Sequence, residues 1–160
     1  MKPEALKLGL HIERATTSLS TPDDATFRKW VVAALAGRRA EAVMGVRIVD
    51  DEEGQRFNLQ YRGKDYATNV LSFPAEAPIG LPREIAEPQL GDLLICAPVV
   101  GREAREQGKN EEDHWAHLTV HGVLHLLGYD HEEQVEADVM EALEVGVLEN
   151  LGVSDHYCDI

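Results

Sequence analysis

A run of eleven residues from His121 to His131 constrains the local fold of this chain more than any other stretch. It is His-Gly-Val-Leu-His-Leu-Leu-Gly-Tyr-Asp-His, so His121 and His125 stand four residues apart. On a helix, that spacing places both imidazoles on one face, one turn apart. Gly128 can adopt the left-handed conformation that ends a helix, and the chain can then bring His131 back toward the same point. The segment therefore predicts a helix, a glycine turn and three histidines around one metal ion.

Imidazole ligands suit zinc, copper, iron and nickel. Three neutral histidines leave the fourth tetrahedral position of zinc open, as in catalytic sites, and a water there becomes a nucleophile near neutral pH. We therefore expect one Zn²⁺ per chain, with nickel or another divalent metal as the alternative. His117 also stands four residues from His121, so ligand sets that use His117 stay open. We expect His114 and His117 to be polar neighbours of the site rather than ligands.

The histidine spacing is similar to that of the metzincin zinc proteases, with one difference at residue 122. Those enzymes carry a glutamate there, which takes the proton from the metal-bound water, whereas this chain has Gly122. A substrate with negative oxygens of its own needs a cation instead, and phosphodiesters fit that need. Arg62 is the candidate cation, because a guanidinium binds phosphate in bidentate fashion.

The distribution of charge limits the kinds of partner. The net charge of −14 argues against a general nucleic-acid binder. Residues 1–74 carry 11 basic against 10 acidic side chains, a net charge of +1, while residues 75–160 carry 4 against 19, a net charge of −15. Contact with a polyanion should therefore involve the N-terminal half.

Length and composition indicate one folded domain over residues 1–160, because 44% of the residues are hydrophobic and no linker is evident. No apolar run approaches the roughly 20 residues that span a bilayer, and the N-terminus shows no signal-peptide pattern. We therefore expect a cytoplasmic protein without membrane contact. Cys96 and Cys158 make no disulfide framework and are expected to be idle thiols.

Periodicity and capping residues predict the order of helices and strands. Thr21 and Pro22 predict the start of the first helix, Asn110 caps the helix that carries the histidines, and residues 75–89 form a long loop. In a last helix, apolar residues at helical spacing predict a core-facing stripe: Val135, Val139, Leu143 and Val147. The fold class is α+β, a mixed sheet of about four strands packed with helices, with the metal-binding helix and turn in the C-terminal half. Strands are predicted at residues 6–13, 42–49, 68–73 and 90–96, and helices at 21–36, 50–60, 98–107, from 110 through the histidines, and from about 132 to 152.

Three stretches resemble the YbeY family, the bacterial metal-dependent endoribonucleases that act as ribosomal RNA maturation factors. They are residues 121–131, Leu59–Pro74 and Leu90–Ile95, within a match that covers about residues 40–150. The resemblance implies zinc held by His121, His125 and His131, and it implies that Arg62 is the family's functional arginine, which acts on RNA. It further implies single-strand-specific cleavage in 3′-end maturation of small-subunit ribosomal RNA and in ribosome quality control. The implied partners are the small ribosomal subunit and ribosomal-protein or assembly-GTPase partners.

Two other functions remain as alternatives. One is a metal-dependent peptidase or other hydrolase, which the histidine spacing favours and Gly122 argues against. The other is a ribosome-assembly factor without enzymatic activity, whose metal holds the fold together and whose acidic half contacts basic ribosomal proteins.

Overall fold

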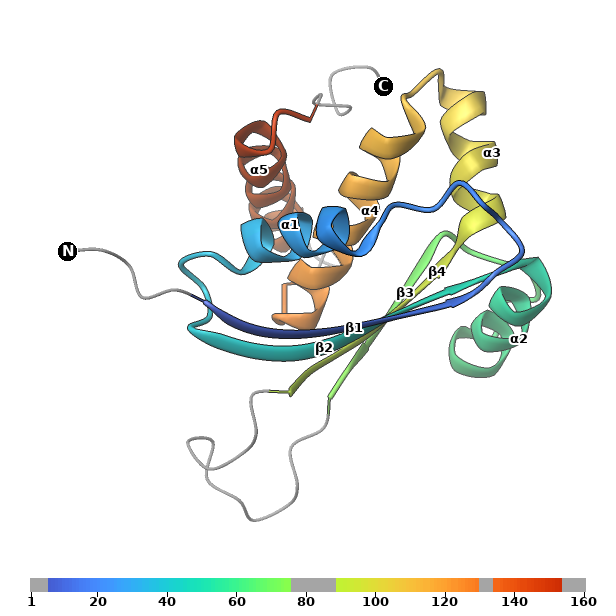
Figure 1. Cartoon of the computed structure of the whole chain (residues 1–160), viewed down its shortest axis with the longest axis horizontal. Coiled ribbons are helices and arrows are strands. Elements are labelled where there is room, and N and C mark those ends of the chain that lie inside the picture. The colour runs from blue at the N-terminus through green and yellow to red at the C-terminus, as the bar shows by residue number, and fades with distance from the viewer. Residues whose placement is uncertain (1–5, 76–88, 130–133, 154–160) are drawn as a thin grey trace, which may run out of the picture.

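The computed structural model describes residues 6–75, 89–129 and 134–153. Within them the chain forms four strands and five helices, and Figure 1 shows how these are arranged. This confirms the predicted α+β class. The elements are β1 (Lys7–Ala15), α1 (Asp24–Leu35), β2 (Glu41–Val49), α2 (Asp51–Arg62), β3 (Val70–Pro74), β4 (Gln89–Cys96), α3 (Ala97–Gln107), α4 (Glu111–Leu126) and α5 (Gln134–Asn150).

The four strands make one mixed sheet in the order β1-β2-β4-β3. Strands β1, β2 and β4 are parallel, and β3 pairs antiparallel with β4 at the edge of the sheet. The register sets His11 beside Gly45 and Gly45 beside Asp92, so that these residues form one row across three strands. The sheet is therefore mixed, as the sequence predicted.

The two faces of the sheet differ in what covers them. Helices α1, α4 and α5 pack on one face, called the inner face here, while α2 packs on the other, the outer face (Figure 1). The inner core includes an aromatic group in which Phe27 meets Trp30 and Trp115 edge to face, with ring centroids 5.6 and 5.9 Å apart. Because side chains alternate between the faces along a strand, neighbouring residues of β2, β3 and β4 serve different layers.

The histidine-bearing helix α4 begins and ends where the sequence predicts. At its start the Asn110 side chain accepts a hydrogen bond from the Asp113 amide at 3.2 Å. At its end Gly128 has a φ of 102°, in the left-handed region that favours glycine. The amide of Tyr129 then donates to the carbonyl of Leu124 at 3.1 Å, the bond of a glycine-terminated helix end.

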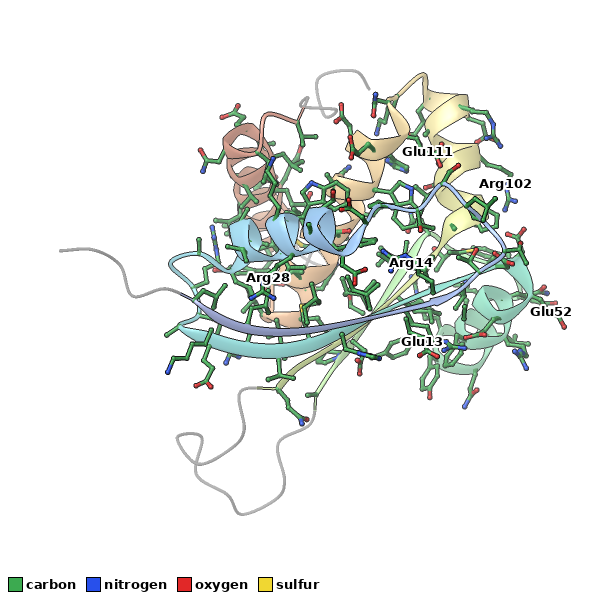
Figure 2. The ribbon with its side chains drawn as sticks, in the orientation of Figure 1. Glu13, Arg14, Arg28, Glu52, Arg102 and Glu111 are labelled. Carbon is green, nitrogen blue, oxygen red and sulfur yellow. The ribbon has the colours of Figure 1, made fainter. Side chains whose placement is uncertain are left out.

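Helix α1 begins later than predicted. Its N-cap is Asp23, whose carboxylate accepts from the Thr26 amide at 2.8 Å, whereas Thr21 and Pro22 lie before the helix. The reason is a contact from another element. Arg14 on β1, labelled in Figure 2, donates to the Thr21 hydroxyl at 3.2 Å and to the Pro22 carbonyl at 2.6 Å.

The predicted apolar stripe of α5 is wrong at Val139, which is 48% exposed. Val147 is buried and Leu143 packs half-buried against the core, as predicted, while the side chain of Val135 lies outside the described residues. The other buried side chains among those described on this helix are Met140, Glu144 and Leu148. A glutamate therefore occupies a core position.

Some predictions lie outside the described residues, namely residues 76–88 of the predicted loop and Cys158. Cys96 is a buried free thiol, and burial raises the pKa of that thiol to about 11, in keeping with an idle side chain. In the part of the chain that the structure describes, no helix combines the length and apolar character needed to cross a membrane.

Candidate metal centre

Two of the three predicted ligands converge on the same point. The Nε2 atoms of His121 and His125 lie 3.1 Å apart, and their ring centroids are 4.6 Å apart. Two nitrogen ligands at about 2.0–2.1 Å from a tetrahedral zinc ion lie roughly 3.3 Å from each other. The donor atoms and their spacing therefore fit a metal ion such as zinc.

His131, the third predicted ligand, lies outside the described residues. Among the residues that the structure describes, no set of three potential ligands surrounds a common point. The glycine turn at Gly128 is formed as the prediction requires. The complete set of His121, His125 and His131 thus stays a prediction.

Glu144 of α5 holds two of the histidines of α4. Its side chain is 1% exposed, one carboxylate oxygen contacts Nδ1 of His121, and the other lies 3.4 Å from Nε2 of His117. Burial raises the pKa of Glu144, but hydrogen bonds from His117 and His121 outweigh that effect and hold the pKa below its usual value. Sequence reasoning missed this residue, although an acid at a helical position among Met140, Val147 and Leu148 was a signal for it.

His114 has a different carboxylate partner. It is 3% exposed, and its Nε2 lies 2.9 Å from Oε1 of Glu103, which also accepts from the Asn69 amide at 3.0 Å. Burial raises the pKa of Glu103, but the hydrogen bonds from His114 and Asn69 lower it further than burial raises it. His114 thus joins α4 to α3 and to the segment before β3, as a supporting residue would.

Gly122 has a packing reason to be a glycine. A Cβ atom at this position would lie 2.8 Å from Leu93 Cδ2 and 3.4 Å from Val70 Cγ2, so this side of α4 rests directly on the inner face of the sheet. The Gly122 carbonyl also accepts from the Ser72 hydroxyl at 3.3 Å. A glutamate here would therefore collide with the sheet.

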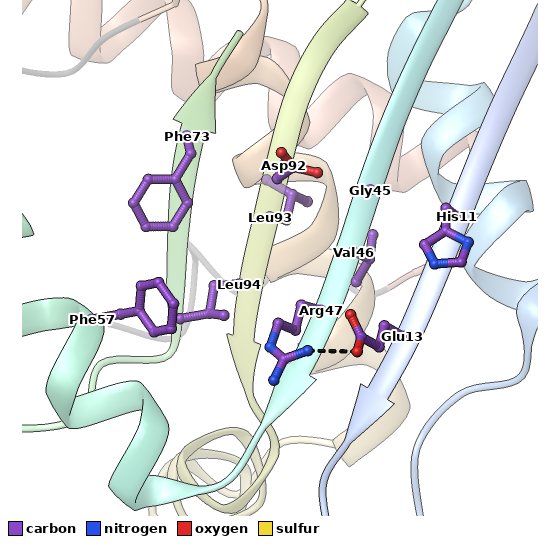
Figure 3. A pocket seen from close by; sticks show the side chains of 10 residues that line it. All are labelled: His11, Glu13, Gly45, Val46, Arg47, Phe57, Phe73, Asp92, Leu93 and Leu94. Carbon is purple, nitrogen blue, oxygen red and sulfur yellow. Dashed lines mark ion pairs between the residues drawn. The ribbon is translucent and has the colours of Figure 1, made fainter.

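The outer face carries a cavity of about 260 Å³, shown in Figure 3. Gly45 and Asp92 both line it, and the Asp92 carboxylate occupies the space beside Gly45 that a side chain would need: a Cβ atom at Gly45 would lie 2.4 Å from Oδ1 of Asp92. Arg47 lines the cavity, but it pairs with Glu13 at 2.7 Å and donates to Glu53 at 3.0 Å. These carboxylates raise the pKa of Arg47 and neutralise its charge, so the cavity does not offer a free cation.

Arg62 lies on the outer side, as the last residue of α2 before the left-handed Gly63. The helix is anchored by Tyr61, whose ring stacks on Phe57 with centroids 5.9 Å apart and meets Phe73 at 4.9 Å. The Arg62 side chain is exposed and makes no hydrogen bond or ion pair within the described residues. The structure therefore does not bring Arg62 into contact with His121 or His125.

Comparison with known proteins identifies the family. Residues 11–152 match the family model described as Endoribonuclease YbeY. Proteins named Endoribonuclease YbeY from Xanthomonas campestris and Stenotrophomonas maltophilia are each 58% identical to this chain over 152 residues, covering 95% of it and 94% of their own length. A solution structure of a Thermotoga maritima protein has a TM-score of 0.56 over 88% of this chain and 91% of that one, at 23% identity, and so shares the fold. The chain thus belongs to the YbeY endoribonuclease family.

Proposed function

We propose that this protein is a zinc-dependent endoribonuclease that cleaves single-stranded RNA. The observation that carries the proposal is the convergence of the His121 and His125 Nε2 atoms at 3.1 Å, in a chain of the YbeY endoribonuclease family. His131 is the proposed third ligand. A bound zinc ion would supply an acidified water as the nucleophile.

Arg62 is proposed to bind the phosphate of the RNA backbone. Its guanidinium is exposed and uncommitted within the described residues, so both N–H edges can reach a phosphate. Charge that builds on the phosphoryl oxygens during cleavage would be stabilised by such a fork. Gly122 supports a phosphodiester rather than a peptide substrate. The glutamate that a metzincin peptidase carries at this position would have no room, because Leu93 and Val70 of the sheet lie against Gly122.

We further propose that the substrate is ribosomal RNA of the small subunit, at the 3′-end maturation and quality-control stage, in the cytoplasm. The C-terminal half, with its net charge of −15, disfavours tight capture of free RNA. Recruitment through basic ribosomal proteins or an assembly GTPase would overcome that repulsion.

Cleavage of matched single-stranded and duplex RNA by purified protein tests the proposal. We expect the single strand to be cut, His121→Ala to lose both bound zinc and activity, and Arg62→Glu to lose activity alone. Cleavage that survives both substitutions would contradict the proposal and indicate a contaminating nuclease.

One observation favours a second function, that of an assembly factor with a structural metal. Glu144 joins α5 to α4 through His117 and His121 inside the protein. A metal bound by His121 would therefore strengthen the link between the two helices. Thermal unfolding with and without a chelator separates the two functions. A large fall in melting temperature, with no RNA cleavage by the zinc-loaded protein, would favour the structural role.

A further inference from the structure

The carboxylate of Glu144 is buried in the core, where packing alone would favour an apolar side chain. An ionised carboxylate that is 1% exposed is costly unless hydrogen bonds and opposite charge compensate it. Here the compensation comes from two imidazoles of the neighbouring helix, His121 and His117. This arrangement connects α5 directly with the proposed metal ligands.

We propose that Glu144 is a positioning residue of the proposed metal centre. Its carboxylate sets the tautomer of His121 and keeps His117 out of the ligand set. The inference rests on the proposed metal site. It concerns this chain's own hydrogen bonds, so it can be tested without RNA.

The tautomer argument starts from the two nitrogens of His121. A neutral imidazole carries one N–H, and the contact between Nδ1 and the Glu144 carboxylate requires that proton on Nδ1. Nε2 is then left with a lone pair, and it is this atom that faces Nε2 of His125 at 3.1 Å. The same contact holds the His121 ring in place.

The second argument concerns His117, which the histidine spacing left open as a ligand. Its Nε2 lies 3.4 Å from the second oxygen of Glu144. Its ring centroid is 6.3 Å from that of His121, compared with 4.6 Å between His121 and His125. The same carboxylate therefore orients His121 toward the metal and holds Nε2 of His117 against α5.

Metal affinity of the full-length protein, measured by competition with a chromogenic zinc chelator, tests the proposal. We expect Glu144→Leu to weaken zinc binding by about 10- to 100-fold, the usual effect of removing such a partner. Glu144→Gln keeps a hydrogen-bond acceptor without the charge, so it should restore part of the loss. Glu141→Gln, the same substitution at an exposed position three residues earlier on α5, should leave zinc affinity unchanged.

Nitrogen-15 NMR of the histidines in the zinc-free protein measures the tautomer of His121 directly. If Glu144 only stabilised the fold, its substitution would leave that tautomer unchanged. We expect His121 to be in the Nδ1–H form in the wild type and to become a mixture of tautomers in Glu144→Leu. If the leucine variant does not fold, Glu144→Gln and the wild-type spectrum still decide the matter.

Three results would overturn the proposal. The first is wild-type zinc affinity in folded Glu144→Gln and Glu144→Leu variants, and the second is an Nε2–H tautomer of His121 in the wild type. The third is a loss of affinity in His117→Ala as large as in His125→Ala, because His117 would then be a ligand. A protein that binds zinc as expected but cuts no RNA would contradict the proposed function and leave this inference standing.

Discussion

The inner and outer faces of the sheet carry different parts of the proposed site. The inner face is covered by helices, and its histidines are held by the half-buried Glu103 and the buried Glu144. The outer face is open, with a cavity beside α2 and the exposed Arg62 at the end of that helix. The proposed metal ligands and the proposed phosphate-binding arginine thus lie in two separate layers of the protein, and it should be possible to damage one without the other.

The edge strand β3 is where the two layers meet. On its inner side Ser72 donates to the Gly122 carbonyl, next to His121. On its outer side the next residue, Phe73, contacts the ring of Tyr61, next to Arg62. A single strand of RNA that reaches both Arg62 and the histidines would pass this edge, which no further described strand covers.

The largest effect is expected from His121→Ala, on the inner face. The protein should lose stoichiometric zinc and its RNA cleavage should fall to background, because one of the three proposed ligands and its link to Glu144 are both removed. Metal analysis beside a cleavage assay checks this. Full zinc content in the variant would remove His121 from the ligand set.

On the outer face, Arg62→Glu should lower cleavage by about 10²- to 10³-fold, the usual cost of removing a group that stabilises developing charge. Zinc content should stay at the wild-type level, since α2 packs on the other side of the sheet. Arg56→Glu, an exposed residue of the same helix, is the matched control for the change in charge. Equal losses in the two variants would indicate general electrostatics rather than a specific phosphate contact.

Gly122→Ala tests how closely the inner layer is packed. The added methyl meets the buried Leu93, so we expect the free energy of unfolding to fall by about 1–3 kcal/mol in urea titrations. Gly146→Ala on α5 is the control, because nothing lies within 4 Å of its Cβ and alanine favours helix. A Gly122→Ala protein as stable as wild type would show that the helix can move away from the sheet without cost.

The smallest effect concerns acid stability. The pKa of Glu103 is lower in the folded protein than its usual 4.5, so this carboxylate stabilises the fold above that pH and loses the contribution as the pH falls through the folded-state value. We expect Glu103→Gln to be less stable than wild type at pH 7 by about 0.5–1 kcal/mol, with the difference shrinking below pH 4. Urea titrations at several pH values measure it. A difference that grew on acidification would contradict the assigned direction of the shift.

Local features of this chain were predictable because they depend on residues close together in sequence. Asn110 caps α4 and Gly128 ends it through contacts within a few residues, so both were predicted correctly. The start of α1 was not, because Arg14 binds Thr21 and Pro22 from a different element. Val139 on α5 was wrongly predicted to be buried for a similar reason: the packing of this helix against α4 and α1, not the apolar pattern alone, decides which of its residues are buried.

The sequence by itself determined the helix, the glycine turn and the pair of histidines one turn apart, since the 3.6-residue period and glycine's conformational freedom require no distant partner. It also carried the motifs that identify the family. Only the tertiary structure decided that Glu144, 23 residues beyond His121, lies against it, and that Gly122 rests on Leu93. It likewise decided that Arg62 belongs to the outer layer. These contacts follow from how helices stack on the two faces of a sheet: periodicity can indicate which side of a helix is buried, but not which residue of another element it meets there.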